Sequence, residues 1–160
     1  MNELRDPEHR VSPKARQMWF VSTATEGLFT VVVTILVTTL WLDGWWTWPA
    51  IAAAAVIAVL TSLGVPRWRY LVHRWEATET AVYTQRGWWS RERRIAPMSR
   101  VQTVDFTQGP LARIFGLATV TVTTASAAGP LRIDGLESAM ALRLVEELTR
   151  KADLAEGDAT

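Results

Sequence analysis

Two long stretches of this chain contain no charged residue, and they constrain its fold more than any other feature. Charge is absent from residues 27–42 and again from residues 44–66, with Asp43 alone between them. Charged side chains are costly inside hydrocarbon, and a helix needs about 20 mostly apolar residues to cross a bilayer. The sequence therefore predicts a transmembrane helical hairpin over residues 19–66, with spans at about 27–46 and 48–66.

The ends of the predicted spans carry interfacial residues. Four tryptophans cluster around the connector, namely Trp41, Trp45, Trp46 and Trp48. Tryptophan prefers the depth of the lipid headgroups, so this cluster fits a tight turn at the membrane surface. We expect Glu26 at the opposite interface, after an amphipathic lead-in, because a carboxylate in mid-bilayer costs about 3 kcal/mol. The alternative is that Glu26 is an intramembrane ion or proton site.

Basic residues flank the predicted hairpin on both sides and are absent from its connector. They are Arg5, Arg10, Lys14 and Arg16 before the first span, and Arg67, Arg69 and Arg74 after the second. The positive-inside rule then predicts a multi-pass protein of the cell (plasma) membrane with both termini cytoplasmic, and residues 1–18 as a cytoplasmic segment. A cleaved signal peptide is the alternative. The late start of the apolar stretch and the lack of a small-x-small site before Asp43 oppose it.

Residues 67–152 have the pattern of a β-rich domain that ends in a helix. Short strands are expected at residues 70–77, 81–86, 88–95, 101–106, 119–124 and 131–133, with one helical turn at 111–115. Leu136, Met140, Leu144 and Leu148 then recur every four residues, which indicates an amphipathic helix. The predicted class is α+β: a two-helix hairpin followed by an antiparallel barrel or sandwich of six to seven strands, capped by the C-terminal helix. Residues 153–160 are polar, and we expect a disordered tail.

Composition excludes most kinds of catalytic and metal site. The chain has no Cys, so thiolate ligands, Cys nucleophiles and disulfides are ruled out. Its two histidines, His9 and His73, are too far apart in sequence to suggest a metal site or a catalytic triad. Phosphate-binding glycine loops are absent, and the formal net charge of +1 does not suggest a nucleic-acid partner. We therefore expect no enzyme activity, no cofactor, no metal and no nucleic-acid binding.

The order of elements resembles a known family. The resemblance covers about residues 15–150, and its matching segments are residues 86–89, 94–104, 108–120 and 124–125. The specific ones are Pro-x-Ser-Arg-Val-Gln at 97–102 and Gly-Pro-Leu-x-Arg-x-Phe-Gly-Leu-Ala-Thr at 109–119. In these features the chain resembles the YdbS-like bacterial membrane proteins, which carry a bacterial pleckstrin-homology (PH) domain after a membrane hairpin. The resemblance implies a PH-like fold, a membrane location, no known catalysis and no agreed ligand.

Arginine dominates the early strands. Residues 67–134 hold ten Arg and five acidic residues. Alternation along a strand places Arg91 and Arg93 on one face and Arg94 on the other. Together with Arg86, these arginines would form a surface for anionic lipid or for a partner. Each basic side chain near a negative membrane contributes about 1 kcal/mol to binding. The alternative is that they are solvated strand residues. PH domains that bind phosphoinositides use Lys and Arg between their first two strands. Residues 76–79 here are Glu-Ala-Thr-Glu, which argues against a phosphoinositide pocket at that place.

Three further residues are site candidates. Trp88 and Trp89 follow a glycine at an expected hairpin, where one ring would dip into the membrane interface, or else one fills the core and the other covers the sheet. Arg113 lies in the short helical turn. We expect it to lock that turn by pairing with Asp105 or Asp134, and the alternative is that it grips a partner's carboxylate. Asp105 itself has no second acid at a spacing useful for catalysis.

These observations favour a non-catalytic membrane-anchored module that presents a protein-interaction surface at the cytoplasmic face. The first alternative is an anionic-lipid sensor that uses the arginine-rich strands. A more distant one is a subunit of a membrane transport or enzyme complex, with Glu26 or Asp105 as the working carboxylate. The expected partners are the lipid bilayer and other membrane proteins, including a second PH-domain protein or another copy of this chain.

Overall fold

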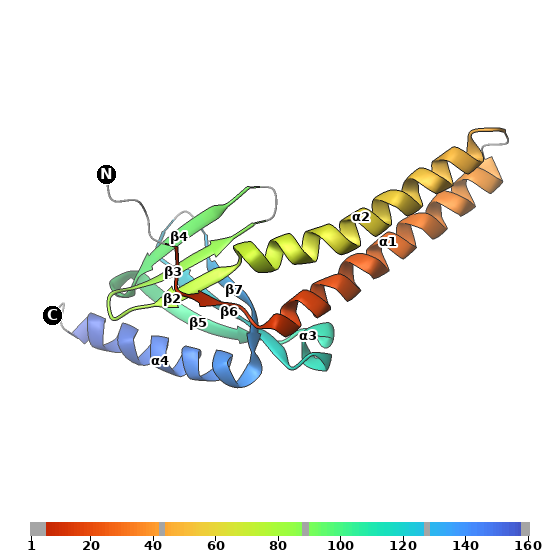
Figure 1. Cartoon of the computed structure of the whole chain (residues 1–160). Helices are drawn as coiled ribbons and strands as arrows, with labels where there is room; N and C mark the ends of the chain where they lie inside the picture. The colour runs from red at the N-terminus through yellow and green to blue at the C-terminus, as the bar shows by residue number, and fades with distance from the viewer. Residues whose placement is uncertain (1–5, 42–43, 88–89, 127–128, 158–160) are drawn as a thin grey trace. The chain divides into compact units, whose positions relative to one another are not determined.

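The computed structural model describes residues 6–41, 44–87, 90–126 and 129–157. The chain forms two compact units. One is Arg16–Trp68, and the other combines Met1–Ala15 with Arg69–Thr160. Figure 1 labels the helices and strands of both units.

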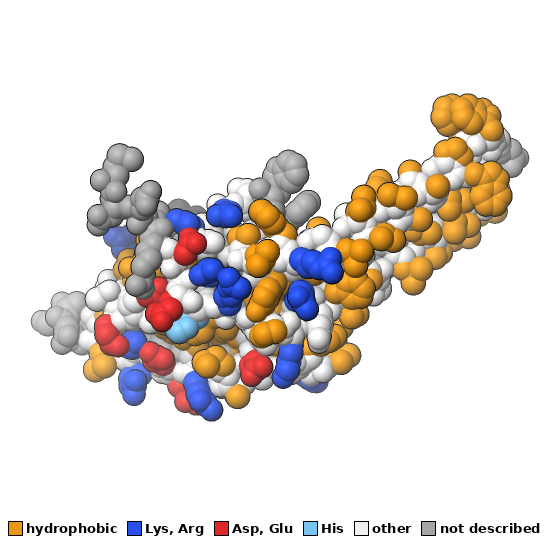
Figure 2. All heavy atoms as spheres, viewed as in Figure 1, with side chains coloured by type: hydrophobic (Ala, Val, Ile, Leu, Met, Phe, Trp, Pro, Cys, Tyr) orange, Lys and Arg blue, Asp and Glu red, His pale blue; other side chains and the backbone are white. Residues whose placement is uncertain are grey.

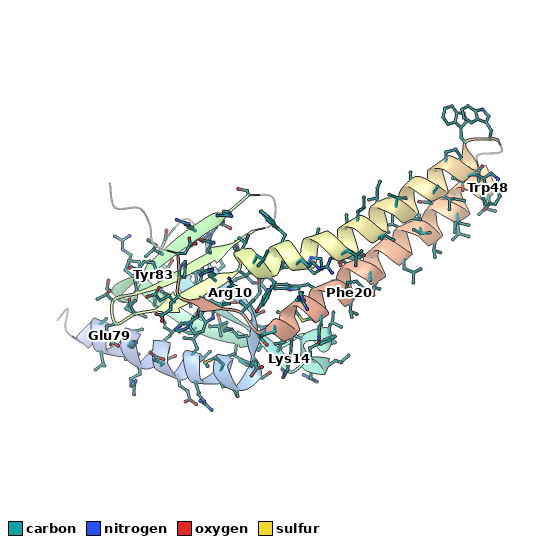
Figure 3. The ribbon with its side chains drawn as sticks, viewed as in Figure 1. Arg10, Lys14, Phe20, Trp48, Glu79 and Tyr83 are labelled. Carbon is teal, nitrogen blue, oxygen red and sulfur yellow. The ribbon has the colours of Figure 1, made fainter. Side chains whose placement is uncertain are left out.

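The first unit contains most of two long apolar helices, α1 (Pro13–Trp41) and α2 (Thr47–Val72). Both are long and apolar enough to cross a membrane by length and composition. Leu28, Leu40 and Trp48 are more than 60% exposed although they are hydrophobic. Hydrophobic side chains cover this surface in Figure 2, and Trp48 lies near the tip of the hairpin in Figure 3. A surface of this kind is stable in lipid and not in water.

Hydroxyl groups on α1 are satisfied within the helix. Thr30 donates to the carbonyl of Glu26, Thr34 donates to that of Thr30, and Thr38 donates to that of Thr34, at 2.8–2.9 Å. Polar side chains in a bilayer have no water to bond with, so a bond to the preceding turn lowers the cost of placing them there.

The helices have the following ends, and the expected spans at 27–46 and 48–66 stay predictions. α1 ends at Trp41. α2 continues through Pro66 as far as Val72, and His73 N donates to the carbonyl of Arg69 at 2.9 Å. The strand predicted from residue 70 therefore begins only at Arg74, because this last helical turn takes up the residues before it.

In the second unit, sheet A has four antiparallel strands in the order β1-β2-β3-β4. They are β1 (His9–Arg10), β2 (Arg74–Ala77), β3 (Ala81–Arg86) and β4 (Glu92–Pro97). The strand predicted from residue 88 begins at Glu92 instead. Gly87, directly after β3, has no room for a side chain: its φ is +129°, and a Cβ there would lie 1.8 Å from the carbonyl oxygen of Ser90.

Sheet B has three antiparallel strands in the order β5-β6-β7. A short 3-10 helix, η1 (Met98–Arg100), leads into β5 (Val101–Thr107), α3 (Pro110–Ile114), β6 (Leu117–Thr124) and β7 (Leu131–Glu137). Its most buried residues include Leu117, Val120 and Val122, which are fully buried. The high β-propensity of β-branched residues accounts for β6, which the sequence also predicts.

The C-terminal helix α4 (Ser138–Gly157) closes the core of this unit (Figure 1). Ala141, Leu144 and Leu148 are buried, whereas Met140 is 47% exposed. A strict four-residue repeat drifts around a helix of 3.6 residues per turn, so Ala141 and not Met140 faces the core. The helix runs to Gly157, past the end expected at residue 152. Two apolar helices, an open antiparallel sandwich and this capping helix confirm the predicted α+β, PH-like fold.

Candidate functional site

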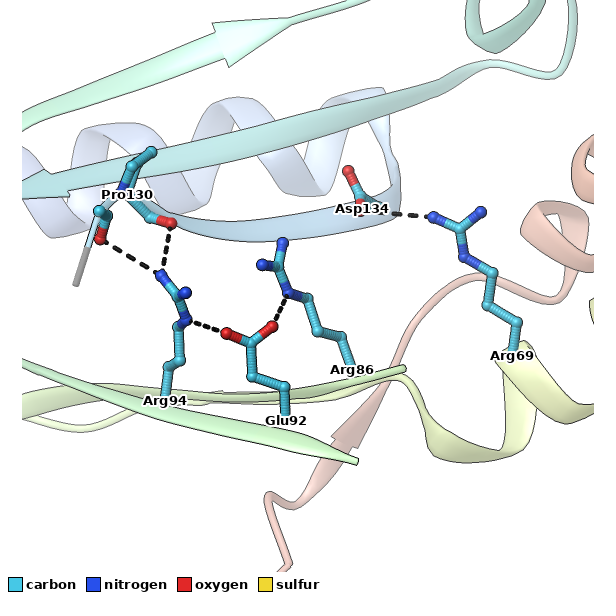
Figure 4. Close-up of polar contacts among 7 residues, drawn as sticks. Arg69, Arg86, Glu92, Arg94, Pro130 and Asp134 are labelled. Atoms are coloured by element: carbon cyan, nitrogen blue, oxygen red, sulfur yellow. Dashed lines mark hydrogen bonds and ion pairs between the residues drawn. The ribbon is translucent and has the colours of Figure 1, made fainter. Parts of the chain in front are cut away.

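Arginines gather where sheet A meets β7 (Figure 4). Arg86 on β3 donates through Nε to Glu92 on β4 at 2.8 Å, and Arg94 donates to the other oxygen of Glu92. The register pairs Arg86 with Glu92, and alternation brings Arg94 to the same face. Arg94 also donates to the carbonyl oxygen of Pro130 at 3.2 Å, which connects β4 to the start of β7.

A second carboxylate completes this group of residues. Asp134 on β7 lies 3.7 Å from the guanidinium of Arg69 and 3.6 Å from that of Arg132, and it accepts a hydrogen bond from Thr119 at 3.1 Å. Arg69 belongs to the last turn of α2. We call Arg69, Arg86, Arg94 and Arg132, together with Glu92 and Asp134, the arginine cluster. Four cations and two anions give it a formal charge of +2.

The cluster changes the protonation of its neighbours. Hydrogen bonds from Arg86 and then Arg94 hold the pKa of Glu92 below its usual range. His73, which is 5% exposed, has its pKa lowered to about 4 by burial first and then by the charge of Arg69. Its Nδ1 lies 2.8 Å from the carbonyl oxygen of Arg69, so this nitrogen carries the proton and donates it. His73 is therefore neutral at physiological pH.

The structure divides the residues that the sequence predicts as one surface. Arg86 and Arg94 belong to the cluster. Arg93 lies on the other face of β4, where it donates to Gln85 at 2.9 Å and to Asp6. Arg91 is exposed. The two tryptophans of the prediction, Trp88 and Trp89, lie outside the described residues.

The turn around α3 is held by Gln108, whose role the sequence pattern does not indicate. Within the described residues, no ion pair joins Arg113 to Asp105 or Asp134. Asp134 pairs with Arg69 and Arg132, and Asp105 accepts a hydrogen bond from Thr103. Instead, Gln108 donates to the carbonyl of Leu117 at 2.8 Å and to the hydroxyl of Ser138 at 2.6 Å. These bonds join the turn to β6 and to the first residue of α4.

A groove lies at the end of sheet B where β5 begins and β6 ends. Among the described strands, β5 pairs only with β6, so its other edge has no strand partner. A cavity of about 470 Å³ lies between the start of β5 and the end of α4. It is lined by Met98, Ser99, Arg100, Val101, Gln102, Ala125, Ala152 and Ala155. We call it the edge groove. Arg100 is its one charged lining residue in the described chain, and it forms no ion pair there.

Comparison with known proteins identifies the family. Residues 25–152 match the family model described as "Bacterial PH domain". The chain is also 31% identical over 158 residues to the UPF0699 transmembrane protein YdbS of Bacillus subtilis (strain 168), covering 95% of this chain and 97% of that protein. The chain belongs to the bacterial PH domain family. No solved structure matches it. The resemblance to YdbS-like proteins is confirmed, and with it a membrane protein that carries a PH domain.

In the described part of this bacterial PH domain, no three His, Asp or Glu side chains gather in one place. The sequence points to Arg86, Arg94 and the neighbouring arginines, but it gives no reason to add Arg132. The available signal is the alternation of β7, in which Leu131 and Ile133 are buried while Arg132 is exposed. Alternation shows that Arg132 and Asp134 share a polar face, but it does not show which strand that face meets.

Proposed function

We propose that this protein is a non-catalytic, membrane-anchored PH module that presents a peptide-binding surface at the cytoplasmic face of the plasma membrane, with both termini cytoplasmic. The edge groove is that surface. Its occupant is an extended segment of another membrane protein that carries a carboxylate. The basic residues on both flanks of the hairpin, and their absence from its connector, support this orientation.

The free edge of β5 is the observation that carries the proposal. Its unpaired backbone N–H and C=O groups can accept one more strand, and recognition by strand addition is common at such edges. The groove at the start of β5 has small side chains at Ala125, Ala152 and Ala155, which leave room for the side chains of an added segment. Arg100 supplies one positive charge, which selects a segment with an acidic side chain or a terminal carboxylate.

Membrane anchoring strengthens a weak contact of this kind. Two proteins confined to one bilayer meet at a higher effective concentration than two proteins in solution, so a modest groove is sufficient for binding. An anchored module also needs no catalytic residues, because its role is to hold a partner at the membrane.

Site-specific photocrosslinking in living cells tests the proposal. A photoreactive amino acid at Ala152, inside the groove, is compared with the same amino acid at Ala139, which is exposed on the first turn of the same helix. We expect a discrete product from position 152 alone, with the crosslink mapped to a carboxylate-bearing segment of a membrane protein. Arg100→Glu should lower its yield about tenfold, whereas Arg143→Glu, with the same charge change on α4, should not.

Three outcomes would contradict the proposal. The first is equal yields at positions 152 and 139, and the second is a yield at position 152 that Arg100→Glu leaves unchanged. The third is a product that contains only a second copy of this chain, which would make the groove a self-association site. Product loss with both Arg100→Glu and Arg143→Glu would indicate a general effect of charge on folding, and would also count against the groove.

An anionic-lipid sensor is the second candidate, favoured by the +2 charge of the arginine cluster and by exposed Arg91. Hydrogen exchange of the full chain in nanodiscs tests it. We expect backbone amides of residues 90–94 to be protected in discs with anionic lipid at low salt and not in neutral discs. Equal exchange in both kinds of disc would exclude the sensor.

A further inference from the structure

The arginine cluster contains more positive charge than its own carboxylates can neutralise. Arg86 and Arg94 share Glu92, and Arg69 and Arg132 share Asp134 at 3.6–3.7 Å, which is too long for a strong hydrogen bond. Like charges so close together repel one another, most strongly where water is partly excluded. This repulsion lowers the stability of the folded domain, and a bound anion would remove the repulsion.

Arg86 provides donors for such an anion. Its Nε is bonded to Glu92, but in the described chain its two terminal nitrogens have no acceptor. Figure 4 shows this end of the guanidinium pointing toward β7, in the space between Pro130 and Asp134. The side chain is 29% exposed, so the site is open to a ligand and yet partly shielded from water.

We propose that the arginine cluster is a binding site for a phosphate group, with Arg86 as its principal donor and Arg132 as a second contact. The planar guanidinium fork matches two oxygens of a phosphate, which a compact ammonium group does not. A phosphomonoester carries a charge of about −1.5 to −2 at neutral pH, which balances the +2 of the cluster. A phosphodiester carries only one negative charge and balances half of it.

The phosphomonoester comes either from a soluble molecule or from a lipid whose headgroup is a terminal phosphate. Arg69 lies on α2, three residues after Pro66. The site is separate from the edge groove, and the inference stands whether or not that groove binds a peptide.

Calorimetric titration of the full chain distinguishes the two sources. In detergent, inorganic phosphate and glycerol 3-phosphate are the soluble probes, with chloride keeping the ionic strength constant. In nanodiscs, phosphatidic acid is compared with phosphatidylglycerol, which is a phosphodiester. Saturable one-to-one binding of either soluble probe supports a soluble ligand. Binding confined to phosphatidic acid supports a lipid headgroup, and both results support the site.

Arginine variants show whether the bound phosphate occupies this cluster. Arg86→Gln should weaken binding at least about tenfold, since it removes charged hydrogen bonds. Arg132→Gln should weaken it several-fold without disturbing Glu92, which keeps the test valid if Arg86→Gln does not fold. Arg143→Gln, at an exposed arginine on α4 outside the cluster, has the same charge change and should bind as the wild type does. A phosphate near Arg69 and Arg86 should also raise the pKa of His73, which nuclear magnetic resonance measures directly.

Two results would overturn the inference. One is the absence of saturable binding of all of these probes, and the other is equal affinity in Arg86→Gln, Arg132→Gln and Arg143→Gln. Either would mean that the arginines serve only to join sheet A to β7. Neither result bears on the crosslinking at Ala152, so failure here is distinguishable from failure of the proposed function.

Discussion

Gly27 on α1 lies directly against Ala58 on α2: a Cβ at position 27 would come within 2.9 Å of the Cβ of Ala58. Such a distance is too short for two carbon atoms, so only glycine lets the helices of the hairpin approach this closely. Small residues at helix contacts are typical of membrane proteins, where association depends on close packing because lipid is as apolar as the side chains.

Gly27→Leu should therefore destabilise the hairpin by about 1–3 kcal/mol, since an oversized side chain at a tight contact forces the helices apart. Gly64→Leu is the matched control, because Gly64 on α2 is exposed and a Cβ there meets nothing within 4 Å. Unfolding of the full chain in mixed micelles, followed by tryptophan fluorescence, measures both. Equal losses in the two variants would show that position 27 is not a packing contact.

The parts of the fold that local pattern determines were predictable. Two charge-free stretches indicate apolar helices, and alternation with turn glycines places β3 and β6 near their observed bounds. Strand β1 could not be found in this way. His9–Arg10 is two residues long, and it joins β2 through backbone groups that any side chain leaves available.

The candidate site was predictable only in part, for the same reason. Arg86, Glu92 and Arg94 meet through one hairpin, so spacing and alternation are enough to bring them together. Arg69 and Asp134 meet through the order of elements in space, which short-range pattern does not contain. Gln108 was missed because an amide in a turn looks like a solvated residue until the carbonyl of Leu117 is placed beside it.

Gln108→Ala should lower the stability of the PH domain by about 1–3 kcal/mol. The variant leaves the carbonyl of Leu117 and the hydroxyl of Ser138 without their donor in a partly buried place. Gln102→Ala makes the same change at an exposed position on β5 and should have little effect. Urea unfolding of the full chain in mild detergent provides the comparison. A Gln108→Ala midpoint that matches that of Gln102→Ala would contradict the role of Gln108 as a tie.

Lys151 should stabilise the contact between the end of α4 and the β2–β3 turn. Its ammonium group, on a side chain 10% exposed, lies 2.6 Å from Glu147 and 3.0 Å from Glu79, which is labelled in Figure 3. The hydrogen bond to Glu147 raises the pKa of Lys151, so this stabilisation persists at neutral pH and is lost only at high pH. We expect Lys151→Met to cost about 1 kcal/mol, measured by thermal unfolding.

Lys14→Met is the control for Lys151. Lys14 pairs with Glu137 at 3.5 Å, but both side chains are more than half exposed, and such pairs contribute little. The expected loss is therefore smaller for Lys14→Met than for Lys151→Met. The reverse order, or no difference, would mean that burial of Lys151 adds nothing to its ion pairs.

His73 should make the domain less stable in mild acid. Its pKa is about 4 in the folded protein, because of burial and the charges of Arg69 and Arg86, and about 6.5 in an unfolded chain. Between these values the unfolded chain takes up a proton that the folded one does not, so stability falls as the pH falls from about 6.5 to about 4. The loss amounts to about 1.4 kcal/mol per pH unit within this window, and about 2 kcal/mol at pH 5.

His73→Asn isolates this effect from the titration of carboxylates. The amide nitrogen of Asn takes the place of Nδ1 and can still donate to the carbonyl of Arg69, but it does not titrate. Urea unfolding at about pH 7 and pH 5 should show the wild type losing about 2 kcal/mol more than the variant. Equal losses would mean that His73 accepts a proton in the folded state. The positive charge of Arg69 and Arg86 would then be neutralised by something other than Glu92 and Asp134.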